Sequence, residues 1–161
     1  MDGLVANYTF DSHACDVSGN NNNATPNGGF AYTSDRFGNP GGAGNFNATN
    51  SYVAAPSSNS LNSPTTSITL AGWAKANLPV PELHGFLTKI NDVSIQYRMG
   101  VAPDAFDPSK TNIYFGTSFS STLVPLAGDY NALQWNHYAV TWNGSEVRFY
   151  LNGKQVDTEQ A

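Results

Sequence analysis

The sequence is poor in basic residues, in cysteine and in long apolar runs. It has 7 Lys+Arg against 12 Asp+Glu, a formal net charge of −5 and a pI of about 4.8. Nucleic acids and anionic membrane surfaces are bound by faces rich in Lys and Arg, so the composition argues against both as partners. No apolar run approaches the roughly 20 residues that span a bilayer, which argues against membrane insertion. The single cysteine, Cys15, excludes an intrachain disulfide.

Sequence motifs of common hydrolases are also missing. Glycoside hydrolysis uses two carboxylates about 5 to 10 Å apart, which a strand can supply from alternate positions. Only three glutamates occur, and no Glu-x-Asp-x-Glu sequence is present. The three histidines show no zinc-ligand spacing, and there is no Gly-x-Ser-x-Gly sequence. We therefore expect a protein that is not an enzyme.

What the chain has in abundance is turn-forming residues. It contains 19 Asn, 15 Gly and 9 Pro among 161 residues. These residues favour turns and loops over helix interiors, and no window shows a convincing helical periodicity. The length suits one domain with a substantial core. The sequence therefore predicts an all-β fold, an antiparallel two-sheet jelly-roll sandwich formed by a single domain over residues 1–161.

Two Asn-Gly dipeptides, Asn143-Gly144 and Asn152-Gly153, join three alternating runs between residues 137 and 157. Asn-Gly suits the two-residue type I′ turn, which needs φ > 0 at both central positions. Counting outward from such turns predicts these cross-strand pairs: Val140 with Val147, Tyr138 with Phe149, Phe149 with Val156, and on the opposite face His137 with Tyr150, Ala139 with Arg148 and Arg148 with Asp157. The segment is therefore predicted to form a three-stranded β-meander with one apolar face.

Shorter alternating runs predict the remaining strands. The first, residues 4–10, places Leu4, Ala6, Tyr8 and Phe10 on one face. Further strands are predicted near residues 24–25 and over residues 30–33, 43–46, 52–55, 67–76, 85–90, 93–99, 112–118 and 123–126. The polar connection over residues 56–66 is predicted to carry one helical turn around Leu61. Trp73, Trp135 and Trp142 are predicted to be core residues, and His137 a hydrogen-bonded sheet residue.

Seven segments, in order, resemble one known family. They are Leu4-Val-Ala-Asn-Tyr-Thr-Phe10, Asp16-Val-Ser-Gly-Asn20 with the asparagines that follow, Asp35-Arg-Phe-Gly-Asn39, Ile68-Thr-Leu-Ala-Gly-Trp-Ala-Lys75, Leu87-Thr-Lys89, Trp135-Asn-His-Tyr-Ala-Val-Thr-Trp142 and Phe149-Tyr-Leu-Asn-Gly153. Together they are similar to the laminin-G-like jelly roll of the concanavalin A-like lectin/glucanase superfamily. The resemblance implies two packed antiparallel sheets, in agreement with the meander.

The chain departs from that family at two places. Family members often have carboxylates where this chain has Asn47 and Ser51. They also continue into a closing strand, whereas this sequence stops at Ala161. The resemblance therefore implies either a fragment of a longer protein that lacks its final strand, or a sheet whose open edge is completed by another segment or chain.

A calcium ion (Ca2+) is the cofactor that the chain could hold. Calcium takes 6 to 8 hard oxygen ligands, which Asp carboxylates, Asn amides and loop carbonyls provide. The loop of residues 16–23 and the segment of residues 35–39 offer this chemistry, and the resemblance implies a structural calcium in such loops. The candidate ligands are Asp16, Asn20 and Asp35. The same residues also occupy turns for conformational reasons alone.

A glycan site would combine an aromatic platform with amides and carboxylates that bind hydroxyl groups. Six aromatic residues could serve: Tyr32, Phe86, Tyr97, Phe106, Tyr114 and Tyr130. Tyr97, Tyr114 and Tyr130 are the candidates for carbohydrate binding. The leading hypothesis is a non-catalytic extracellular or cell-surface module that binds a glycan or a matrix ligand. The alternatives are a structural or protein-interaction domain and, third, a glycoside-active enzyme.

Overall fold

The computed structural model describes residues 3–46, 50–76, 83–91, 94–107, 110–117, 121–126 and 130–160. Contacts along the chain group it into two compact units, Met1–Pro64 and Thr65–Ala161. The single domain expected over residues 1–161 stays a prediction.

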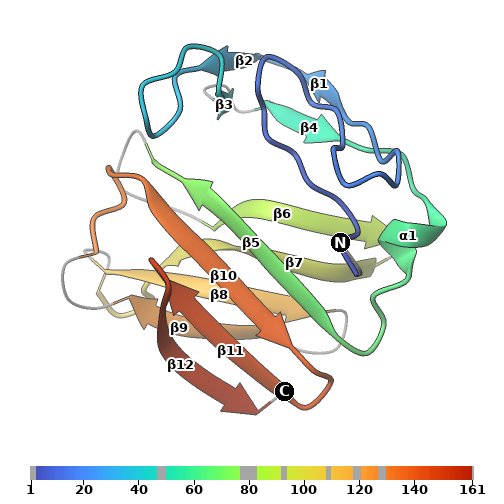
Figure 1. Ribbon diagram of the computed structural model, residues 1–161. Helices are drawn as coiled ribbons and strands as arrows, with labels where there is room; N and C mark the ends of the chain where they lie inside the picture. Colours follow the sequence, from blue (N-terminus) through green and yellow to red (C-terminus); the bar gives the residue numbers. More distant parts are fainter. Residues whose placement is uncertain are drawn as a thin grey trace. The chain divides into compact units, whose positions relative to one another are not determined.

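The elements are almost entirely strands (Figure 1). They are β1 (Thr25–Asn27), β2 (Phe30–Thr33), β3 (Ala43–Phe46), β4 (Tyr52–Ala54), α1 (Asn59–Asn62), β5 (Ile68–Ala74), β6 (His84–Asn91), β7 (Ser94–Pro103), β8 (Thr111–Thr117), β9 (Ser121–Leu126), β10 (Asn136–Trp142), β11 (Glu146–Leu151) and β12 (Lys154–Gln160). In the described ranges, no helix has the length and apolar character needed to cross a membrane. The all-β prediction is confirmed.

The first unit contains two small antiparallel sheets, β1–β4 and β2–β3. Aromatic rings pack together beside β2 and β3, where Phe30 lies 5.1 Å from Phe46 and 5.0 Å from Tyr32 between ring centroids. The helical turn predicted around Leu61 is α1, and Ser58 caps it by accepting a hydrogen bond from the Leu61 amide.

The strand predicted over residues 4–10 is wrong, since this segment makes only an isolated bridge between Tyr8 and Asp16. Asparagine and serine side chains take the backbone groups that a neighbouring strand would have used. The Val5 carbonyl accepts hydrogen bonds from the side chains of Ser18, Asn20 and Asn22. Local side-chain bonds thus compete successfully with a sheet ladder.

The second unit is a sandwich of two four-stranded antiparallel sheets, ordered β12-β11-β10-β5 and β6-β7-β8-β9 (Figure 1). Side chains from both sheets form one core. Its buried members are Leu70, Tyr97, Met99, Val101, Ile113, Phe115, Val124, Leu126, Tyr138, Val140, Val147 and Phe149. Tyr138 and Phe149 lie in this core together, as the meander predicted. The two-sheet jelly-roll class is confirmed.

The pairing predicted for the first hairpin is wrong by two residues. Val140 lies opposite Phe149, and Trp142 lies opposite Val147. Asn143 does not adopt the positive φ of a type I′ turn, and its side-chain oxygen instead accepts hydrogen bonds from the amides of Ser145 and Glu146. The loop is therefore longer. A shift of two residues changes the partners and keeps the faces, because side chains alternate with period two.

The second hairpin has the predicted turn, with φ of 50° at Asn152 and 79° at Gly153. Leu151 pairs with Lys154 and Tyr150 with Gln155 next to this turn. A bulge between Phe149 and Tyr150 then shifts the ladder, so that Phe149 faces Asp157 in place of Val156 and Arg148 faces Thr158 in place of Asp157. The bulged strand leaves Val156 40% exposed.

Candidate functional site

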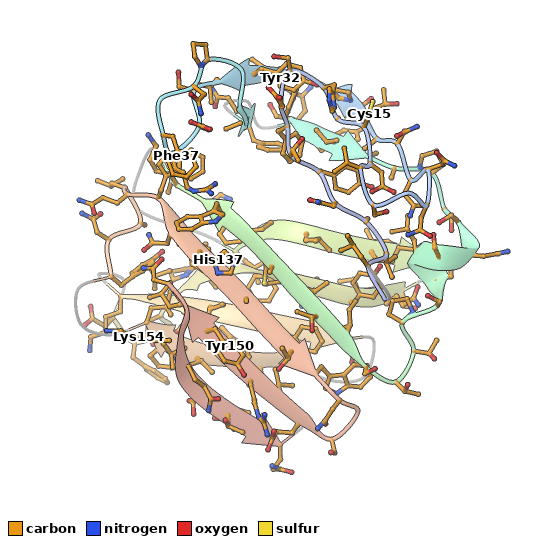
Figure 2. All side chains as sticks on the ribbon, in the orientation of Figure 1. Cys15, Tyr32, Phe37, His137, Tyr150 and Lys154 are labelled. Atoms are coloured by element: carbon orange, nitrogen blue, oxygen red, sulfur yellow. The ribbon has the colours of Figure 1, made fainter. Side chains whose placement is uncertain are left out.

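The outer face of the sheet β12-β11-β10-β5 carries an exposed aromatic pair. Trp73 in β5 and His137 in β10 are direct cross-strand partners. Leu70 and Tyr138 turn into the core, so alternation turns Trp73 and His137 to solvent. Their ring centroids are 5.3 Å apart at an interplanar angle of 58°. Figure 2 shows His137 on this face.

The Asn152-Gly153 turn closes the site beside His137. The Asn152 amide N–H donates to the His137 carbonyl at 2.8 Å, and the Asn152 side-chain oxygen accepts from the His137 amide at 2.9 Å. The Asn152 side-chain nitrogen donates to the buried Asn136 side chain at 3.0 Å. The turn is thus fixed against β10 through both its backbone and its side chain.

Trp73, His137, Asn152 and Gly153 line an open hollow of about 400 Å³. This volume is at the small end of the range for small-molecule sites. Trp73 is 45% exposed, and no described residue hydrogen-bonds the imidazole nitrogens of His137. Among the described residues, the lining combines the indole of Trp73 and the imidazole of His137 with the uncharged Asn152 and Gly153. Indole rings can stack on sugar rings, and imidazole nitrogens can exchange hydrogen bonds with hydroxyl groups.

The calcium candidates are occupied by other partners. The Asp16 carboxylate accepts from the amides of Asn7, Ser18 and Asn22 and from the Ser18 hydroxyl, at 2.8 to 3.0 Å. Burial raises the pKa of Asp16, but these hydrogen bonds together outweigh it and hold the pKa below its ordinary value. The side-chain nitrogen of Asn20 donates to the carbonyls of Leu4 and Val5.

Asp35 organises a separate turn. Its carboxylate accepts from the amides of Phe37 and Asn39 at 2.8 and 2.9 Å and from the Asn39 side chain at 3.0 Å. In the described residues, no three His, Cys, Asp or Glu side chains gather as metal ligands. Each Asp16 carboxylate oxygen thus accepts two hydrogen bonds, while Asp35 Oδ2 accepts one. Calcium binding by Asp16, Asn20 and Asp35 stays a prediction, and the donors around Asp16 disfavour it there.

The three tyrosines predicted to bind carbohydrate are not brought together on one exposed surface. Tyr97 is 5% exposed and belongs to the core, where burial raises the pKa of its hydroxyl. Tyr114 is 1% exposed and lies on the other side of the same sheet, with the Arg98 guanidinium 5.3 Å from its ring centroid. Half-buried Tyr130 contacts the Tyr138 hydroxyl at 3.0 Å. Their burial argues against a stacking role.

Trp73 is the residue that the sequence interpretation misplaced. It was predicted as core but lies on the solvent face. Trp142 is half-buried and packs against the core, in keeping with its prediction, while half-buried Trp135 has the Lys75 ammonium 5.8 Å from its ring centroid. The alternation of residues 67–76 did contain the signal, because it placed Trp73 on the face of Thr69 and Lys75 and opposite Ile68 and Leu70.

Comparisons with known proteins agree with this architecture. A family model described as the concanavalin A-like lectin/glucanases superfamily matches residues 47–161. The fold is similar to domain 4 of AbnA, a GH43 extracellular arabinanase from Geobacillus stearothermophilus, solved in complex with arabinotriose. That match has a TM-score of 0.70 and 20% sequence identity, and covers 98% of this chain and 75% of the other. No curated protein matches the sequence. The chain belongs to the concanavalin A-like lectin/glucanases superfamily.

Proposed function

We propose that this chain is a non-catalytic carbohydrate-binding module of an extracellular protein. The observation that carries the proposal is the open hollow in which Trp73 and His137 face solvent side by side. A sugar presents C–H groups on its ring faces and hydroxyl groups at its rim. The indole therefore stacks on a ring face, and the imidazole nitrogens of His137 exchange hydrogen bonds with hydroxyl groups.

The lining of the hollow favours binding over hydrolysis. Two carboxylates are needed to cleave a glycosidic bond, and none lies among Trp73, His137, Asn152 and Gly153. The similar domain from the extracellular arabinanase was solved with arabinotriose, which supports a carbohydrate ligand and an extracellular setting. Fold similarity alone does not carry a function, so the proposal depends on the site.

The first test is an array of neutral arabinan, xylan, glucan, mannan and galactan oligosaccharides of one to five units. We expect the wild-type protein to bind the oligosaccharides of at least one of these polysaccharides. Trp73→Ala is expected to weaken binding about thirtyfold, as for an anchor residue worth about 2 kcal/mol. Its thermal midpoint should stay close to wild type, because Trp73 lies on the solvent face.

The matched control is Phe106→Ala. Phe106 is 98% exposed and lies in the β7–β8 connection, outside the sheet that carries the hollow. This variant should bind as the wild type does. A wild type that retains no glycan contradicts the proposal and favours a structural or protein-interaction domain. Release of shorter sugars from a retained oligosaccharide would instead indicate an enzyme.

A further inference from the structure

The outer face continues past the hollow as a row of three cross-strand partners, two of which are alanines. Ala71 in β5, Ala139 in β10 and Tyr150 in β11 are successive cross-strand partners. Because Tyr138 and Phe149 point into the core, alternation places Ala139 and Tyr150 on the solvent side. The surface is therefore low at the two alanines, with Trp73 at one end and the half-buried Tyr150 at the other.

The register sets the separation of the two aromatic residues. Trp73 lies two strands and two residues away from Tyr150, which places their Cα atoms about 12 Å apart in an antiparallel sheet. Figure 2 shows His137 and Tyr150 on the same face of the sheet. This span exceeds one sugar ring and is within reach of a short oligosaccharide.

The charges of this face lie outside the row, at Arg148 and, two residues beyond Trp73, at Lys75. Arg148 is in the next row along β11 and forms an ion pair with Glu146. Gln155, the partner of Tyr150 on β12, is uncharged. No described residue hydrogen-bonds the Tyr150 hydroxyl. The surface from Trp73 to Tyr150 thus combines aromatic rings and neutral hydrogen-bonding groups, which suits an uncharged ligand.

We propose that this surface binds a neutral oligosaccharide that lies across strands β5, β10 and β11, with Trp73 and Tyr150 stacking on two separate sugar units. The inference rests on the proposed function and extends it from one sugar to a chain of at least three. Ala71 and Ala139 leave room for the unit between the two aromatic residues. A single sugar occupies the hollow at Trp73 and gains nothing from Tyr150.

The experiment measures affinity against chain length for the series that the array retains, using the monosaccharide, the trisaccharide and the pentasaccharide. The indole N–H signal of Trp73 in NMR spectra reports the weak monosaccharide binding. We expect wild-type affinity to rise from one to three units. Tyr150→Ala should weaken trisaccharide and pentasaccharide binding about tenfold and leave monosaccharide binding unchanged.

A second variant tests the same surface without removing an aromatic residue. Ala71→Gln places a neutral side chain on the exposed low part of the surface, and should likewise weaken only the longer ligands. Phe106→Ala should change neither the affinity for the monosaccharide nor the affinity for the longer oligosaccharides. Wild-type affinity that does not depend on length, or a Tyr150→Ala variant that binds the trisaccharide normally, overturns this inference while the proposed function stands. A wild type that binds no sugar overturns both.

Discussion

Among single residues, Asp16 shows how one carboxylate organises a loop that has little regular structure. Its two oxygens accept from three backbone amides and one hydroxyl, which brings together Asn7, Ser18 and Asn22. The Asp16 amide in turn donates to the side chain of Asn23. Charge-assisted bonds of this kind are stronger than neutral ones, so the ionised carboxylate stabilises the loop.

The loop around Asp16 should therefore depend on pH. Because the folded-state pKa of Asp16 lies below its ordinary value of 3.8, the stabilisation is complete above that value and is lost as the pH falls through the folded-state pKa. We expect the amides of Asn7, Ser18 and Asn22 to keep their hydrogen-exchange protection until the pH is well below 3.8. Protection that disappears at or above pH 3.8 would contradict this.

Substitution of the same residue gives an independent check. Asp16→Asn replaces one acceptor oxygen by an NH2 group that faces donors, and should lower the free energy of unfolding by about 2 kcal/mol in a urea titration. Asp11→Asn is the matched control, because Asp11 is exposed and its carboxylate accepts no hydrogen bond from the described residues. Equal effects of the two substitutions would show that the Asp16 bonds contribute little.

Single residues also show where the sequence was misread. Trp73 was predicted to be a core residue from its place in the strand pattern, yet the alternation puts it on the face of Thr69 and Lys75, and the structure leaves it 45% exposed.

Carbohydrate binding by Tyr97, Tyr114 and Tyr130 stays a prediction, which their burial disfavours. Tyr97 pairs with Thr117 and Tyr114 with Gly100, so the two tyrosines lie three positions apart along the β7–β8 ladder and on opposite faces of the sheet. Their relative placement depends on the register of these strands, which the sequence pattern does not give.

At the scale of elements, the hairpins show what turn chemistry determines. Asn152-Gly153 forms the predicted turn because both residues adopt positive φ. Asn143-Gly144 has the same sequence but forms a wider loop, in which the Asn143 side chain accepts from the amides of Ser145 and Glu146. The dipeptide alone does not distinguish a type I′ turn from a loop closed by its own Asn side chain. The three strands of the meander were therefore predictable, while the register of the first hairpin was not.

The sheet β6-β7-β8-β9 should tolerate no side chain at Gly100. A Cβ there would overlap the carbonyl oxygen of His84 and lie 2.7 Å from a ring carbon of Tyr114. Gly100→Ala is expected to lower the free energy of unfolding by about 1–3 kcal/mol, as overpacking does. Urea titration measures the change.

Gly72→Ala provides the control within a strand of the other sheet. A Cβ at Gly72 meets no atom within 4 Å, so this substitution should be neutral or stabilise the protein by about 0.5 kcal/mol. If Gly100→Ala were as harmless as Gly72→Ala, the close approach of His84 and Tyr114 to Gly100 would be wrong.

At the scale of the whole molecule, the fold was predictable because many weak signals agreed. Amide-rich turns, alternating runs and the ordered family motifs all indicated a β-sandwich, and the core cluster from both sheets of the second unit confirms it. The candidate site was not predictable in the same way. It depends on which strands are neighbours, since β5 and β10 are separated by more than 60 residues in the sequence yet bring Trp73 beside His137.

Calcium binding can be tested on the whole chain, because a bound ion would stabilise the folded protein and raise its midpoint of thermal unfolding. At a concentration 100 times its dissociation constant, a ligand adds about 2.7 kcal/mol, which would raise the midpoint of thermal unfolding by about 5–10 °C in a protein of this size. The carboxylates of Asp16 and Asp35 already accept N–H donors, so we expect equal midpoints in calcium chloride and in chelator.

Magnesium chloride at the same ionic strength is the control for this measurement. The formal net charge of −5 lets any divalent cation relieve self-repulsion, so a small rise common to both metals would be nonspecific. A rise seen only with calcium would contradict the expectation. Repeating the melt with Asp16→Asn and with Asp35→Asn would then show which loop holds the ion, because only the variant that removes a ligand should lose the calcium-dependent rise.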